Sequence, residues 1–376
     1  MKILGLADLL HDAVEKTSLL VQGAQDSAAR RGYALLENLT PLAGAVHAVQ
    51  DALTAAVHSS IRGINDGVQV ISRTALAGAE TGAGPGMDRA QAALNGLYGD
   101  FLRQQGSGLE IEPGFYDRGE KLLIEREALR RSRPSATGKI CILVHGLGCT
   151  EYEWIPPGGQ DFGERLGELG YTAYRFRYNT GLPVIENGRT LAALIEALVR
   201  EHPVAVSEIA LIGHSMGGLV ARSAAHESQS ALLRHVICLG SPHGGAPLEK
   251  AVHLLASTLG SFEAAGAKVP AQVLEGRSAG IRDLRFGPEI PELKTATYCF
   301  VAACLTKDKD HPLGQLLGDA LVRIPSASGK SRGRRVSFHF GEVLSGLDHL
   351  DLQHHPKVYE LLRVWLSTAL NAHWAD

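Results

Sequence analysis

Cysteine is scarce in this chain of 376 residues. The five cysteines are an odd number, and no metal-ligand spacing joins them. Cys141, Cys238 and Cys299 fall inside apolar strand-like runs, where cysteine usually acts as a small buried hydrophobe. The sequence therefore predicts reduced thiols, with neither a disulfide framework nor a metal centre.

The chain also lacks an excess of charge of one sign and long apolar runs. It has 37 basic and 40 acidic residues, so its net charge of −3 gives no argument for nucleic acid as a partner. No run of about 18 uncharged apolar residues exists, and we expect no transmembrane helix. Asp8 and Asp12 interrupt the apolar start of the chain, which argues against a signal peptide. We expect a cytoplasmic protein without a cofactor.

The composition changes near residues 81–86, which separate an alanine-rich part from the rest. Apolar residues between Val46 and Ile71 recur at steps of three and four, which predicts a long helix with one apolar stripe. We expect a helical N-terminal extension over residues 1–106 and a larger domain over residues 107–376. The stripe would be covered by the rest of this protein or by a second copy. A lipid surface is less favoured, because the opposite face of the helix carries few Lys or Arg residues.

The larger domain alternates between strand-like and helical patterns. Such alternation implies parallel βαβ units, and strands without charge fit a sheet that is buried on both faces. We therefore expect an α/β fold with a mostly parallel central sheet flanked by helices. The predicted strands are 109–112 and 121–125, as an antiparallel pair, then 139–144, 173–178, 208–212, 235–239, 297–302 and 335–340. The predicted helices are 87–105, 161–169, 188–201, 219–225 and 356–369.

The alternation is interrupted between residues 246 and 292 by an apolar stretch of helical character. An insertion at this point would lie over the carboxyl ends of the strands, where such folds place their sites. We interpret it as a candidate lid or pocket wall, with an ordinary helical excursion as the alternative.

The most informative motif is Gly213–Gly218, which matches G-x-S-x-G with Ser215 at its centre. A predicted strand precedes it and a predicted helix follows it, as in a nucleophile elbow, where a sharp turn exposes the serine hydroxyl. Gly213 and Gly217 would let the strand and the helix approach closely. The alternative is a glycine-rich turn whose serine has no catalytic role.

A serine nucleophile needs backbone N–H donors for the developing oxyanion. His145, Gly146, Leu147 and Gly148 follow the first long buried strand, where an H-G-type oxyanion motif is expected. The N–H groups of Leu147 and Met216 would be the donors, and His145, Gly146 and His214 would line the substrate site. A simple strand-ending turn at His145 is the alternative.

The serine also needs a base. His349 lies in the loop between the last predicted strand and the closing helix, where the order serine, acid, histidine places the base. His354 and His355 stand next to Pro356 at the start of that helix, where capping or packing is more natural.

The acid that orients the base should follow the strand at 297–302. Asp319 lies in a glycine turn that leads into an apolar run, which suits a carboxylate held by backbone N–H groups. Asp308 and Asp310 alternate with lysines, which is typical of a solvated charged loop.

Together these motifs resemble the bacterial lipases and esterases of the α/β-hydrolase superfamily and the related GPI inositol-deacylase-like hydrolases. The resemblance covers residues 139–369 and implies a Ser215–His349–Asp319 triad that cleaves carboxylic esters through an acyl-enzyme. Ala320 departs from the family's acid loop, which has a second glycine there. Some of these lipases hold calcium with a carboxylate two residues after the histidine, where Asp351 stands, but no partner carboxylates can be identified.

We therefore expect an esterase or lipase that acts on a small-molecule or lipid ester. Acyl transfer or polyester depolymerisation on the same triad is an alternative. A protein that binds a membrane or a partner, or associates with itself, through its N-terminal helices is the alternative from another class.

Overall fold

The computed structural model describes residues 85–155, 161–228, 230–246, 278–308, 318–331 and 335–367. The chain divides into two compact units, and the unit made of Gln91–Leu259 and Ser278–Asp376 carries the sheet and the candidate site. Only residues 85–90 of the other unit are described. The long helix predicted before residue 81 lies outside the described residues. Residues 247–277, which make up most of the predicted insertion, also lie outside them.

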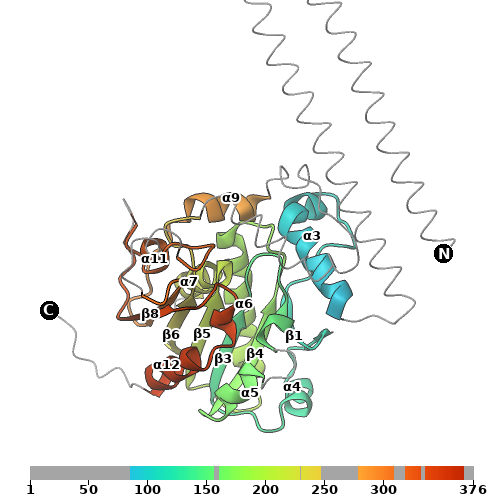
Figure 1. Cartoon of the computed structure of the whole chain (residues 1–376). Coiled ribbons are helices and arrows are strands. Elements are labelled where there is room, and N and C mark those ends of the chain that lie inside the picture. The colour runs from blue at the N-terminus through green and yellow to red at the C-terminus, as the bar shows by residue number, and fades with distance from the viewer. Residues whose placement is uncertain are drawn as a thin grey trace, which may run out of the picture. The chain divides into compact units, whose positions relative to one another are not determined.

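The described strands form one sheet in the order β2-β1-β4-β3-β5-β6-β7-β8 (Figure 1). From β3 to β8 all neighbouring strands are parallel, whereas β1 pairs antiparallel with both β2 and β4. The predicted α/β-hydrolase fold, with a mostly parallel central sheet, is confirmed. The strands are β1 (Gly114–Asp117), β2 (Glu120–Lys121), β3 (Lys139–Val144), β4 (Tyr171–Arg177), β5 (Glu208–His214), β6 (Leu233–Leu239), β7 (Thr297–Cys304) and β8 (Phe340–Ser345).

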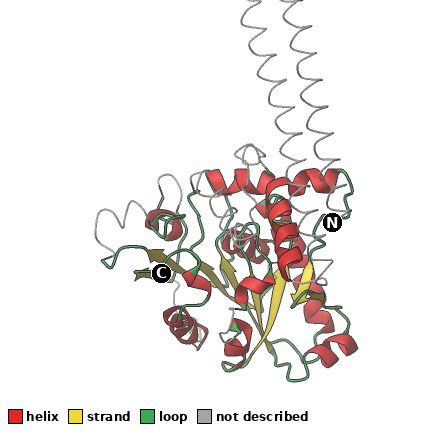
Figure 2. Ribbon diagram, turned by 45° about the vertical axis from the view of Figure 1, so that its right-hand side comes forward, coloured by secondary structure: helices red, strands yellow, loops and turns green. Residues whose placement is uncertain are grey.

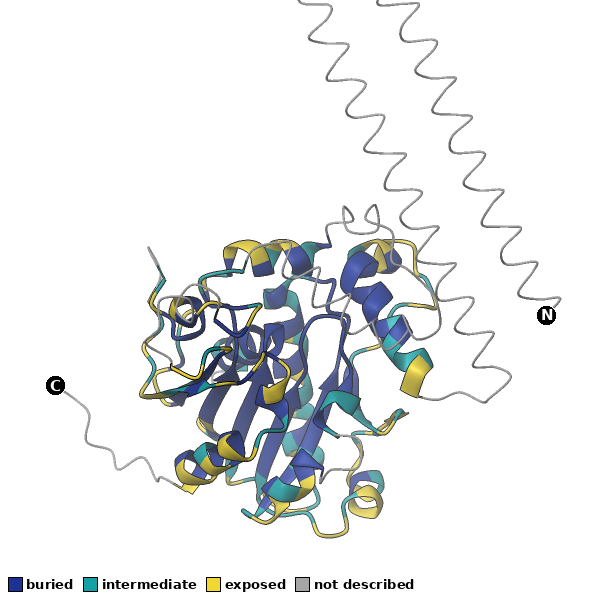
Figure 3. Cartoon of the chain, viewed as in Figure 1, coloured by how far each residue is buried: buried dark blue, intermediate teal, exposed yellow. Residues whose placement is uncertain are grey.

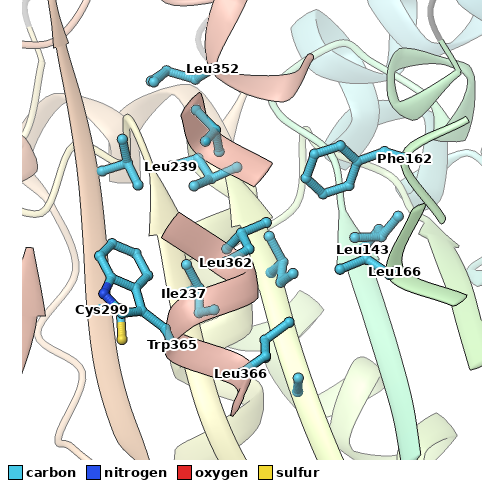
Figure 4. Packing of buried hydrophobic residues seen from close by; sticks show 14 of the residues in the cluster. Leu143, Phe162, Leu166, Ile237, Leu239, Cys299, Leu352, Leu362, Trp365 and Leu366 are labelled. Atoms are coloured by element: carbon cyan, nitrogen blue, oxygen red, sulfur yellow. The ribbon is translucent and has the colours of Figure 1, made fainter. Parts of the chain in front are cut away.

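Helices flank both faces of the sheet, as Figure 2 shows. α5 and α12 bury apolar side chains against one face, where Leu362, Trp365 and Leu366 of α12 lie over Ile237 and Leu239 of β6 (Figure 4). α7 packs on β5 and β6 from the other side and also contacts α6. The described helices are α3 (Pro85–Gln104), α4 (Arg126–Ser132), α5 (Phe162–Gly167), α6 (Val184–Glu201), α7 (Met216–Ser228), α9 (Ala279–Phe286), α11 (Ile324–Ala327) and α12 (Pro356–Ser367), with the short 3-10 helices η1 (Glu151–Trp154) and η4 (Asp351–Gln353).

Strands β3 to β7 are almost entirely buried, whereas β2 and most of β8 are not, and many of the other exposed residues lie on the outer surfaces of the helices (Figure 3). Cys141, Cys238 and Cys299 lie in three of the strands, and all five cysteines are buried and free. The prediction of reduced thiols is confirmed. Among the described residues, no helix combines the length and the apolar character needed to span a membrane.

The predicted antiparallel strand pair at 109–112 and 121–125 is wrong in its position. The hairpin is β1 and β2, and Arg118 and Gly119 turn between them with φ of 49° and 94°. Two successive residues with positive φ make the tight turn that suits the twist of a two-stranded hairpin. The segment before β1 uses its backbone differently, because Asn95 of α3 donates to Leu109 O and accepts from Ile111 N.

The last strand is also later than predicted, because β8 begins at Phe340 and not at Arg335. In the pairing with β7, Gly341 stands opposite Phe300, and a Cβ at Gly341 would lie within 1.9 Å of that ring. The missing side chain therefore makes room for the phenylalanine and sets the register.

Helix α3, from Gln91 on, is tied to the loop after β4. Asn179 donates to Gly99 O at 2.9 Å, and a Cβ at Gly181 would lie 2.1 Å from Asn95 O. Ser278, at the start of α9, donates to Gly96 O at 2.7 Å. This part of the predicted N-terminal extension therefore packs directly on the unit that carries the sheet.

Candidate active site

Ser215 occupies the turn between β5 and α7 in a strained conformation. Its φ is 54°, in the left-handed region that residues with a side chain rarely adopt. The turn is held on both sides, because Ser215 N donates to Leu239 O at 2.8 Å and Gly218 N donates to Ser215 O at 3.1 Å. The serine therefore sits at the carboxyl edge of the parallel sheet.

The two glycines around Ser215 are required by close packing. A Cβ at Gly213 would lie 2.3 Å from Gly217 O, and a Cβ at Gly217 would lie 2.2 Å from Val144 O. The elbow thus presses directly on the backbone at the end of β3, and no side chain fits between them. The close approach that the sequence predicted is present.

His349 and Asp319 form a buried pair. His349 Nδ1 donates to Asp319 Oδ2 at 2.7 Å, and the two residues are only 2% and 1% exposed. The other carboxylate oxygen of Asp319 accepts from Leu321 N and Val322 N at 3.0 and 2.7 Å. Ala320, where the related family has glycine, adopts φ of 79° to make this turn.

The hydrogen bond to Asp319 fixes the tautomer of His349, so its Nε2 carries a lone pair. Nε2 is buried and makes no hydrogen bond to any described residue. No hydrogen bond between Ser215 Oγ and this nitrogen is present among the described residues, and hydrogen bonds between catalytic groups are often long in unliganded enzymes.

Two contacts bring His349 to the elbow. His214, the residue before Ser215, donates through Nε2 to the backbone oxygen of His349 at 2.9 Å, and the two rings are 4.6 Å apart. The ring of His349 also lies against Gly240, where a Cβ would be 3.1 Å from two of its atoms. Gly240 follows Leu239, whose oxygen accepts from Ser215 N. Loops after three strands, β5, β6 and β8, therefore meet here.

The structure also places two of the other candidates, His355 and Asp308. His355 Nδ1 accepts from Lys357 N at 3.2 Å, so this histidine caps the start of α12, as the sequence suggested. Asp308 follows β7 at the surface, and Asp310 lies outside the described residues.

The loop of His145–Gly148, here called the oxyanion loop, lies directly beside Ser215. A Cβ at Gly146 would lie 3.2 Å from Ser215 Cβ, and Leu147 and Met216 are fully buried. Met216 is the first residue of α7, and the first N–H groups of a helix have no partner within it.

Two residues just after β4, Tyr178 and Thr180, hold the oxyanion loop, and sequence reasoning did not identify them. Tyr178 donates to His145 O at 2.8 Å and stacks on the His145 ring. Thr180 Oγ1 accepts from Gly148 N at 3.0 Å. The only signal in the sequence is their place just after a buried strand.

A buried ion pair holds the start of η1, three residues after the oxyanion loop. Glu151 and Arg177 make two hydrogen bonds of 2.6 Å, and both residues are almost fully buried. Such side-on pairing between guanidinium and carboxylate fixes orientation as well as distance. The oxyanion loop is therefore anchored to β4 on both sides of Leu147.

Burial lowers the pKa values of three histidines near the elbow. It lowers the pKa of His145 to about 4, against a usual value near 6.5. Burial, with the neighbouring His349, also lowers the pKa of His214 well below its usual range. Burial and the adjacent Arg222 do the same to the pKa of His243, whose Nδ1 accepts from Arg222 at 3.2 Å.

No group of three His, Cys, Asp or Glu side chains suited to a metal ion occurs in the part of the chain that the structure describes. Asp351, the residue in the position of a calcium ligand in some related lipases, accepts from Asp348 N at 2.9 Å.

Comparison with known proteins points the same way as the topology. Residues 185–270 match the family model described as PGAP1-like alpha/beta domain. The matched segment runs from α6 through the elbow to beyond β6. The resemblance to α/β-hydrolases predicted from the sequence is confirmed. No curated protein matches the chain.

Solved structures that resemble the chain do so at low identity. A Bacillus licheniformis lipase, BlEst2 in its mature form, is 20% identical, with 62% of this chain and 94% of that chain covered and a TM-score of 0.45. BorB, a type II thioesterase from the borrelidin biosynthetic cluster, is 17% identical over 63% and 93% of the chains, with a TM-score of 0.41. The Pyrococcus furiosus esterase Pf2001 is 17% identical over 61% and 82%, with a TM-score of 0.37.

Proposed function

We propose that this protein is a serine hydrolase that cleaves carboxylic esters through an acyl-enzyme. Ser215 is the nucleophile, His349 the base and Asp319 the residue that orients the base. The N–H groups of Leu147 and Met216 stabilise the oxyanion, and Gly146 lines the site next to the serine. His145 and His214 border the same site and hold its loops in place.

The proposed reaction has two steps. Ser215 Oγ attacks the ester carbonyl while its proton passes to His349 Nε2, and His349 then protonates the departing alcohol. Water attacks the acyl-enzyme in the second step, again losing a proton to His349, and Ser215 is released with the carboxylic acid. Asp319 stabilises the imidazolium that forms in each step.

One observation carries the proposal above the others. The strained Ser215 and the buried His349–Asp319 pair stand at one edge of the sheet, joined through the hydrogen bond from His214 to His349 O. Strained backbone at a nucleophile persists only where the surrounding structure enforces it, which is typical of functional sites. If Ser215 had no catalytic role, nothing would explain a nearby histidine that is oriented by Asp319 and whose Nε2 makes no hydrogen bond to a described residue.

Hydrolysis of p-nitrophenyl esters by the full chain tests the proposal. Ser215→Ala should abolish turnover, whereas the control Ser207→Ala, at the opposite end of β5, should keep it, because Ser207 only donates to Gly138 O. Undiminished hydrolysis by Ser215→Ala would refute the assignment. Adding an alcohol acceptor and analysing the products separates hydrolysis from acyl transfer, since a hydrolase forms the free acid.

A further inference from the structure

A cavity lies between the loops that follow β6 and β7, and these loops also carry Gly240 and Asp319 of the candidate active site. This cavity, of about 610 Å³, is here called the cationic cavity. Its walls come from residues 244–246, from the end of α9 at Arg285 and Phe286, and from residues between Arg323 and Ser331.

The floor of the cationic cavity is tightly built. Ser326 Oγ accepts from Gly244 N at 3.1 Å and donates to Gly245 O at 2.8 Å, which joins two of the walls. A Cβ at Gly244 would lie 2.0 Å from Ser331 Oγ, and a Cβ at Gly245 would lie 2.4 Å from Arg285 O. The three wall segments are therefore held in contact, and their side chains border one space.

The described residues that line the cavity carry charge of one sign. Arg285, Arg323 and Lys330 line it together with Ser326 and Ser331, and none of its described lining residues is acidic. The sequence from Ala320 to Gly341 contains no Asp or Glu and five basic residues. In a chain whose net charge is −3, this is a local concentration of positive charge that favours an anion.

In each of the two loops, only a few residues of chain separate the cavity from the proposed triad or its contacts. Arg323 follows Asp319 by four residues, and Gly244 follows Gly240, which contacts His349, by four residues. Four residues span at most about 14 Å, so Arg323 lies within that distance of Asp319, and Gly244 within that distance of Gly240.

We propose that the cationic cavity binds an anionic group, a phosphate or a carboxylate, carried by the ester that Ser215 cleaves. The guanidinium groups of Arg285 and Arg323 and the ammonium group of Lys330 supply the charge-assisted hydrogen bonds that such an anion needs. The inference rests on the proposed hydrolase function and adds to it a substrate class, acyl esters with a negative charge within reach of the site.

A pair of substrates that differ only in the anionic group tests this proposal. Dihexanoyl phosphatidic acid and dihexanoylglycerol carry the same ester bonds, and the release of hexanoic acid gives kcat/KM for each. We expect the full chain to prefer the phosphate-bearing ester by about tenfold, the effect of one or two charge-assisted hydrogen bonds. The double variant Arg323→Gln/Lys330→Gln should bring the ratio close to one.

The matched control is Arg234→Gln/Lys294→Gln, which removes two exposed positive charges outside the cavity and should keep the wild-type ratio. A preference that is absent in the wild type, or that survives in the cavity variant, would overturn the proposal. Inhibition by inorganic phosphate without any preference between the two esters would mark a site for free anions and would also overturn it.

The failure of the hydrolase proposal can be told apart from the failure of this one. If the wild type releases no acid from either ester, calorimetric binding of dihexanoyl phosphatidic acid is measured on Ser215→Ala. Binding that disappears when Arg323→Gln/Lys330→Gln is added supports the cavity even then. Binding that is absent, or unchanged by the added substitutions, contradicts it.

Discussion

Gly217→Ala is the substitution whose effect the structure defines most sharply. The new Cβ would lie 2.2 Å from Val144 O and 2.5 Å from His145 O, both backbone atoms at the end of β3. The shortfall from a normal contact is about 1 Å, and overpacking against backbone costs about 3 kcal/mol. For a domain of this size the melting temperature should fall by about 6–12 °C.

The same substitution should lower the rate of ester hydrolysis by a larger factor than its effect on stability alone would cause. The displaced atoms belong to the oxyanion loop and to the elbow, and a misplacement of about 1 Å can cost about 100-fold in rate. Thermal unfolding and p-nitrophenyl ester hydrolysis, measured on the full chain below its melting temperature, give the two effects separately.

Gly167→Ala is the matched control, because a Cβ at the end of α5 would meet nothing within 4 Å. It should leave hydrolysis unchanged and raise stability by about 0.5–1 kcal/mol, since alanine restricts the unfolded chain. If Gly217→Ala has the same melting temperature and the same rate of ester hydrolysis as Gly167→Ala, the packing described for the elbow is wrong.

Three further predictions follow from the site. Asp319→Asn should lower kcat for p-nitrophenyl esters by about 10³–10⁴-fold by disturbing the tautomer of His349, and a loss below tenfold would exclude the orienting role. Thr180→Val should lower kcat about tenfold with little change in KM, because Gly148 N loses its partner; an unchanged kcat would separate the loop from catalysis. His145 is protonated below about pH 6.5 in the unfolded chain but only below about pH 4 in the folded chain, because burial lowers its pKa. The free energy of unfolding should therefore fall by about 3 kcal/mol as the pH drops from 6.5 to 4. Urea unfolding of His145→Phe should show a shallower pH slope than the wild type, and parallel slopes would contradict the burial argument.

Local signals in the sequence were sufficient for the elbow and for most of the sheet. The strand before Ser215, the helix after it and the glycines at 213 and 217 all specify the same turn, and each acts on its immediate neighbours. The buried inner parts of β3, β5 and β6, which are residues 140–144, 209–212 and 236–239, are apolar, as is typical of strands covered on both faces.

The rest depended on partners that are distant in the sequence. Before β1, Asn95 takes two of the backbone hydrogen bonds that a strand would use, and in β8 the missing side chain of Gly341 leaves room for Phe300 of β7. The residues that hold the oxyanion loop, Tyr178 and Thr180, form contacts more than thirty positions away. No periodicity in the chain encodes such pairings.

The most direct test of the account is covalent labelling of the full chain with a fluorophosphonate, followed by peptide mass spectrometry. We predict one label per chain, on Ser215, and slow or absent labelling of His349→Ala, because the serine would lose its base. A label on another residue, or labelling of Ser215 at the same rate without His349, would contradict the proposed relay.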